Sequence, residues 1–121
     1  MAVQEQYHDK LKKKMDEYVH LIYRLTRNYP KEELYGVVSQ IRRASMSVIL
    51  NYIEGYARGR SKVNINFLEI SYGSLQESKY LLTFSADENY ITKSEFHEAF
   101  SLAEEIGAML WGTVKKMKAG L

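Results

Sequence analysis

The sequence of 121 residues contains no cysteine, one proline and only seven glycines. Without cysteine it can form no disulfide, no Cys-ligated zinc or iron–sulfur site and no thiol nucleophile. A β-sandwich needs many turns, so the scarcity of proline and glycine argues against one. The apolar runs are only a few residues long and the start of the chain is polar, so we expect neither a membrane span nor a secretory signal. These absences predict a cytoplasmic protein built of helices.

The net charge of +2 conceals an uneven distribution of charge along the chain. Residues 1–62 hold 12 Lys/Arg against 7 Asp/Glu, residues 63–114 hold 2 against 8, and residues 115–121 add three lysines. A chain with this layout either steers a polyanion to one surface or pairs its own helices with one another. Composition alone leaves both interpretations open.

Apolar residues recur at helical spacing in four segments. They predict helices at about 6–27, 31–58, 62–88 and 93–118, within a single domain that covers residues 1–121. Pro30 separates the first two helices, and Thr92 with Glu95 has the spacing of a capping box at the start of the fourth. Four helices with short connections predict an all-α, antiparallel up-down four-helix bundle.

The second predicted helix is apolar on more than one side. Besides its regular seam it carries Met46, Ile49, Leu50 and Ile53, which widen its apolar face beyond one stripe. A helix of this kind is expected to be contacted from two directions, by its own bundle and by another subunit. The sequence therefore predicts a homo-oligomer.

A series of motifs runs through the chain: 23–33 (YRLTRNYPKEE), 40–48 (QIRRASMSV), 51–55 (NYIEG), 58–62 (RGRSK), 67–68 (FL) and 73–77 (GSLQE). In this order they resemble the bacterial four-helix-bundle proteins, also described as ribosomal-RNA intervening-sequence proteins. That family includes Avd, the accessory protein of diversity-generating retroelements. The resemblance covers roughly residues 15–115. It implies a ring-like homopentamer and, for Avd-like members, a basic surface that binds nucleic acid and a reverse transcriptase partner.

The chain departs from the family pattern in the middle of the second helix. Where the family usually has a proline and two small residues, this sequence has Ile49, Leu50 and Ile53. Loss of the proline is expected to straighten the helix, because the ring of proline displaces a backbone hydrogen bond. The bulkier side chains bear on the geometry of any subunit contact made there.

The strongest candidates for binding nucleic acid are Arg42 and Arg43, which lie in an otherwise apolar helix. Adjacent helical positions point about 100° apart, so the two cannot share one contact. One interpretation is that they bind phosphate in a groove or in the interior of a ring. The other is that at least one is buried or interfacial and pairs with a carboxylate such as Glu54 or Glu77.

A second candidate group is Arg58, Arg60 and Lys62, which flank a glycine at the junction between the second and third helices. Three cations beside a helix start are suited to phosphate, although such clusters are often only solvated loops. Two further lysine clusters, at 12–14 and 115–118, can meet at one end of an antiparallel bundle or merely keep the termini soluble.

The sequence offers no constellation typical of an active site. His8, His20 and His97 are scattered, and Asp16 with His20 supplies too few ligands for a closed metal site. No nucleophile elbow or phosphate-cradling glycine loop is present. We therefore expect no catalytic residues, no metal and no cofactor.

Together these observations predict a non-catalytic, low-specificity protein that binds RNA or DNA as a homopentamer. Arg42, Arg43, Arg58, Arg60 and Lys62 would hold the phosphates. By resemblance, it would act as an accessory factor to a reverse transcriptase or with ribosomal RNA. The alternative is an interaction scaffold of the same fold that docks a partner protein, favoured by the acidic run through Glu95, Glu98, Glu104 and Glu105.

Overall fold

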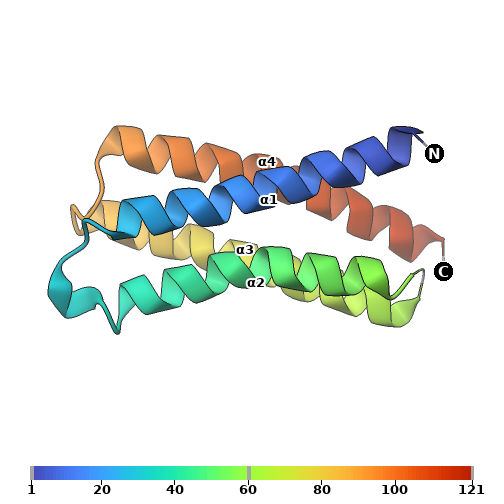
Figure 1. Ribbon diagram of the computed structural model, residues 1–121, viewed down its shortest axis with the longest axis horizontal. Helices are drawn as coiled ribbons and strands as arrows, with labels where there is room; N and C mark the ends of the chain where they lie inside the picture. The colour runs from blue at the N-terminus through green and yellow to red at the C-terminus, as the bar shows by residue number, and fades with distance from the viewer. Residues whose placement is uncertain (1, 60, 121) are drawn as a thin grey trace.

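The computed structural model describes residues 2–59 and 61–120 of the chain. Its elements are α1 (Ala2–Thr26), a 3-10 turn η1 (Lys31–Glu33), α2 (Val37–Ala57), α3 (Lys62–Asp87) and α4 (Lys93–Ala119). Figure 1 shows the four helices running alternately in opposite directions, with both termini and the α2–α3 connection at one end. α1 and α3 each pack against α2 and α4. The all-α up-down four-helix bundle is confirmed, and no helix in the described ranges is long and apolar enough to cross a membrane.

One seam of buried side chains from each helix fills the centre of the bundle. Each fully buried aliphatic or aromatic side chain contributes about 1.5–3 kcal/mol by leaving water. This core therefore holds the four helices together, and the charged residues remain on its outside. The largest enclosed side chains are Leu11, Met15, Tyr18, Ile22, Ile41, Val48, Tyr52, Leu68, Leu75, Leu82, Ile106 and Leu110.

The predicted start of the second helix at residue 31 is wrong. Residues Lys31–Glu33 form only a 3-10 turn, and α2 begins at Val37 after a break at Gly36, whose φ is −110° and ψ −112°. The Oε1 atom of Glu33 accepts a hydrogen bond from the Val37 backbone N–H at 3.3 Å and so caps α2. Leu34, which lies just before this break, is 48% exposed.

The other helix boundaries lie close to the predictions, and two of them have side-chain caps. Thr92 and Glu95 form the predicted capping box, because each side chain accepts a hydrogen bond from the other's backbone N–H, at 3.0 and 2.9 Å. The Ser61 hydroxyl accepts from the Asn64 backbone N–H at 3.2 Å and begins α3. The first helix starts four residues earlier than predicted, at Ala2.

Candidate nucleic-acid interface

The structure divides the predicted phosphate-binding residues between two places. Arg42 and Arg43 lie in the first half of α2, whereas Arg58 and Lys62 flank the α2–α3 connection. Fifteen residues of helix separate Arg43 from Arg58, which is about 22 Å at 1.5 Å per residue. Arg60 lies outside the described residues. The five residues therefore do not form one patch within a single subunit.

Arg42 is half-buried and uses its guanidinium inside the bundle. Its Nε donates to the Thr26 hydroxyl at 2.9 Å, a second nitrogen donates to the Tyr23 carbonyl oxygen at 3.5 Å, and the guanidinium lies 4.5 Å from the centre of the Tyr23 ring. Within the described ranges its hydrogen bonds go to neutral groups and to no carboxylate, so Arg42 does not form the predicted pair with Glu54 or Glu77 within the subunit. Arg42 thus ties α2 to the last turn of α1.

Arg43 is exposed, as expected of a residue about 100° away from its neighbour. It lies beside a shallow groove of about 310 Å³ between α1 and α2. Tyr23 and Thr26 orient the Arg42 side chain. Nothing in the sequence pattern predicts this contact, because it forms between two helices only when the bundle folds. The residues that line the groove include no carboxylate and are Tyr23, Arg42, Arg43, Met46, Ser47, Leu50 and Asn51.

The α2–α3 connection is held in one conformation by short-range contacts. Gly59 has a φ of 69°, which glycine adopts without strain. The Asn64 side chain, which is buried, donates to the Gly55 carbonyl oxygen at 2.5 Å. Arg58 forms an ion pair with Glu54 at 2.9 Å, and its guanidinium lies 5.5 Å from the centre of the Phe67 ring. Lys62, the first residue of α3, is exposed.

The same end of the bundle receives the C-terminal lysines, because α4 ends where α2 does (Figure 1). We call Arg58, Lys62, Lys115, Lys116 and Lys118 together the basic end. Lys118 pairs with Glu69 at 2.6 Å, and no other ion pair of the described residues involves Lys62, Lys115 or Lys116.

The lysines at 12–14 do not join the basic end. Lys14 pairs with Glu105 at 3.1 Å, which places it level with the middle of α4. Glu105 lies ten residues before Lys115, or about 15 Å along the helix. These lysines therefore lie on the side of the bundle, separate from the basic end.

Aromatic residues join α1 to α2 near the basic end. The His8 ring Nδ1 and the Tyr52 hydroxyl are 2.5 Å apart, and the Tyr56 ring lies 4.5 Å from the His8 ring. Burial lowers the pKa of His8, although Asp9 opposes the shift, and burial raises the pKa of the Tyr52 phenol. Tyr52 is 2% exposed and belongs to the core, whereas Tyr56 is 50% exposed. Of Tyr52 and Tyr56, only Tyr56 is exposed enough to contact a nucleobase.

The histidines of the chain do not assemble a metal site. His20 lies 3.5 Å from Asp16 on the outside of α1, and His97 lies on α4. Across residues 2–59 and 61–120 no three His, Asp or Glu side chains are grouped so as to hold a metal ion.

The fold and its surface define a small all-α bundle with one basic end. Residues 8–112 match the family model described as 23S rRNA-intervening sequence protein, and the chain belongs to that family. Its fold is similar to the crystal structure of a protein of unknown function from the S23 ribosomal protein family of Bacteroides thetaiotaomicron. The two have 24% sequence identity and a TM-score of 0.79, over 90% of this chain and 98% of that one. A search of curated proteins finds no match.

Proposed function

We propose that this protein is a non-catalytic, cytoplasmic nucleic-acid-binding protein of low sequence specificity that works as a ring-shaped homopentamer. The observation that supports the proposal is the basic end: the α2–α3 connection, the start of α3 and the C-terminal part of α4, which carry its cations, lie at the same end of the bundle (Figure 1). Lysine and arginine side chains bind nucleic acid through phosphate and carry little sequence information. The family description names an intervening sequence of 23S rRNA, so structured RNA is the first ligand, and a reverse transcriptase is the candidate protein partner.

The basic end is better suited to phosphate than the arginines of α2. Lys62, Lys115 and Lys116 are exposed, and their ammonium groups form no ion pair with other described residues. Arg42, in contrast, has donors committed to Tyr23 and Thr26. Five copies of a modest patch on one ring would give avidity without a strongly basic subunit.

The test is a titration of fluorescently labelled RNA, DNA and RNA–DNA hybrid, followed by anisotropy at several salt concentrations. A Lys62→Gln/Lys115→Gln variant removes two charges from the basic end. Its matched control, Arg27→Gln/Lys31→Gln, removes two charges from exposed positions at the opposite end of the bundle. We expect the first variant to weaken binding at least about tenfold at low salt and to flatten the slope of log K against log salt by about two per subunit.

Two results would overturn this assignment. Absence of binding by the wild-type protein at low salt rules out nucleic acid as the ligand. An equal loss in the control variant shows that binding follows the net charge of the protein and not the basic end.

A second function, a scaffold that docks a partner protein, is favoured by the surface of α4. Residues 94–114 contain four glutamates and no lysine or arginine, and Glu98, Glu104 and Glu105 are exposed. Such a surface repels a polyanion and attracts a basic protein surface. If the wild-type protein fails to bind nucleic acid, this function takes its place.

A further inference from the structure

The outward face of α2 carries apolar side chains that nothing in the subunit covers. Met46, Leu50 and Ile53 follow Arg43 at spacings of three, four and three residues, which places all four on one side of the helix. Leu50 is 55% exposed and Ile53 46% exposed, while the opposite side of α2 lies in the core. We call these four residues the α2 stripe. Contiguous exposed apolar side chains of this kind mark an interaction surface.

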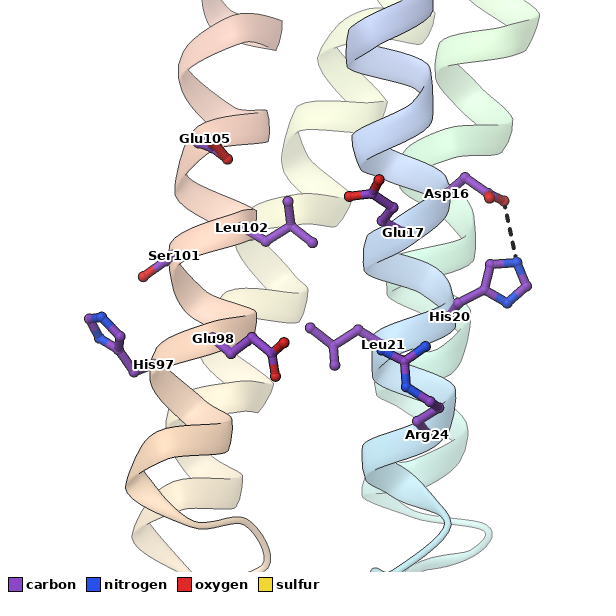
Figure 2. A pocket seen from close by; sticks show the side chains of 10 residues that line it. All are labelled: Asp16, Glu17, His20, Leu21, Arg24, His97, Glu98, Ser101, Leu102 and Glu105. Atoms are coloured by element: carbon purple, nitrogen blue, oxygen red, sulfur yellow. Dashed lines mark ion pairs between the residues drawn. The ribbon is translucent and has the colours of Figure 1, made fainter.

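A groove of about 750 Å³ runs between α1 and α4 on another side of the bundle. Figure 2 shows Leu21 and Leu102 pointing toward each other across it, with Glu17 and Glu98 extending into it from opposite helices. Glu105 also lines the groove and is held by Lys14 at 3.1 Å. No ion pair of the described residues involves Glu17 or Glu98.

The charged groups around this groove leave it negative overall. Glu17, Glu98 and Glu105 stand against Arg24 and against Lys14, which pairs with Glu105, while Asp16, His20 and His97 point away from the space between the helices in Figure 2. The groove thus combines apolar side chains at its base with carboxylates at its edges. A helix with apolar side chains and a flanking arginine fits that combination.

The α2 stripe has this chemistry. Residues 34–53 contain no aspartate or glutamate, and their only charged residues are Arg42 and Arg43. The stripe runs from Arg43 to Ile53, a rise of ten residues or about 15 Å, while the residues that line the groove run from Asp16 to Arg24 on α1 and from His97 to Glu105 on α4, a rise of eight residues or about 12 Å. The two surfaces match in charge and approximately in length, and they lie on different faces of the same chain.

We propose that the α2 stripe of one copy docks into the α1–α4 groove of a second copy. Leu50 then covers Leu21 and Leu102, and Arg43 meets Glu17 or Glu98. This proposal deepens the homo-oligomer of the proposed function, on which it rests, by naming the two surfaces that meet. Because the surfaces differ, the contact is head-to-tail, and it closes a ring when its rotation divides a full turn, which is one fifth of a turn for the proposed pentamer.

The docking also determines where the basic ends lie. Rotational symmetry places every equivalent group at the same height along the axis of the ring. Lys62, Lys115 and Lys116 lie outside both docking surfaces and stay accessible. All basic ends then face the same side of the ring, which is the arrangement a single nucleic-acid molecule can bridge.

The test compares two variants that each lose one surface. The stripe variant is Arg43→Glu/Leu50→Gln and the groove variant is Glu17→Lys/Glu98→Lys; all four positions are exposed, so the fold should tolerate them. By light scattering at micromolar concentration, we expect a multimer for the wild-type protein and 14.1 kDa monomers for each variant alone. An equimolar mixture should assemble at least to a 1:1 heterodimer, because one intact stripe meets one intact groove, and larger assemblies are expected where the glutamate of the altered stripe pairs with the lysines of the altered groove.

A third variant and a matched control complete the test. Arg43→Glu combined with Glu17→Lys/Glu98→Lys swaps the charges across the contact and should recover multimers. Glu104→Lys makes the same charge change on an exposed part of α4 outside the groove and should assemble like the wild-type protein. Circular dichroism checks that each variant keeps its helices.

The outcomes separate this proposal from the proposed function. A wild-type multimer whose mass is unchanged in both surface variants overturns the docking and leaves the homo-oligomer standing. A wild-type monomer overturns both the docking and the ring. Assembly that follows the expected pattern, in a protein that binds no nucleic acid, overturns the nucleic-acid function and leaves the docking intact.

Discussion

The two ends of the bundle are built in different ways. At the end that contains η1 and the α3–α4 connection, residues distant in sequence hold one another. Glu33 caps α2 through Oε1 and accepts a hydrogen bond from the Tyr90 hydroxyl through Oε2 at 2.8 Å. The Tyr90 ring in turn lies 5.3 Å from the ring of Tyr29. We call this end the acidic end, because Glu32, Glu33, Asp87 and Glu88 lie in and beside η1 and the α3–α4 connection.

At the basic end the α2–α3 connection is held by short-range polar contacts, and Lys62, Lys115 and Lys116 are exposed. Arg58 pairs with Glu54 four residues away, and Ser61 caps its own helix at Asn64. The contrast indicates that the acidic end stabilises the connections between helices, whereas three lysines of the basic end have no ion-pair partner among the described residues. Substitutions at the two ends should therefore change different properties.

The largest effect is expected from Glu33→Ala at the acidic end. The substitution removes the carboxylate that accepts from the Val37 backbone N–H, so the free energy of unfolding should fall by about 1 kcal/mol. Urea titration followed by circular dichroism measures the change. Glu32→Ala removes an adjacent exposed carboxylate and is the control. Equal losses in the two variants would mean that Glu33 acts only through its charge.

A second, smaller effect is expected when pH is changed, and it differs between the ends. Burial lowers the pKa of His8 near the basic end, so the unfolded chain binds its proton more tightly. The contribution of His8 to stability is therefore present above pH 6.5 and is lost as pH falls through its folded pKa. At the acidic end, the hydrogen bond to Glu33 raises the pKa of Tyr90 to about 12, so its contribution is lost as pH rises from 10 toward 12.

The free energy of unfolding is measured as a function of pH, between pH 5 and 7 (the acid limb) and between pH 9 and 11 (the alkaline limb), to check both expectations. His8→Gln should flatten the acid limb alone, and Tyr90→Phe should reduce the alkaline limb alone. His97→Gln, at an exposed position, should alter neither limb. If His97→Gln flattens the acid limb as much as His8→Gln does, the buried ring is not its source.

The helices and the buried seams could be predicted because they follow from periodicity, which is a local property. The start of α2 could not. Pro30 followed by Glu32 and Glu33 is typical of a first helical turn, yet Glu33 is used instead to cap α2 four residues later and to bind Tyr90, 57 residues away in sequence. That contact exists only once the bundle has formed.

The candidate site shows the same division between local and tertiary information. The sequence predicts that Arg42 and Arg43 point in different directions, but not which of them turns toward Tyr23 and Thr26. It marks Arg58 and Lys62 as a basic loop. Their proximity to Lys115 and Lys116 follows from the topology, which brings the α2–α3 connection and the end of α4 together (Figure 1).

The smallest effect on stability is expected from Glu54→Gln, which tests the basic end most sharply. The ion pair with Arg58 is exposed, so its loss should cost only about 0.3–0.5 kcal/mol. The same change releases the Arg58 guanidinium and removes a negative charge beside it, so affinity for RNA at low salt should rise about two- to fivefold. Glu77→Gln, farther along α3, removes one charge away from the basic end and should leave affinity nearly unchanged. A gain of the same size in both variants would show that affinity for RNA depends only on the net charge of the protein. The basic end would then not be the binding surface.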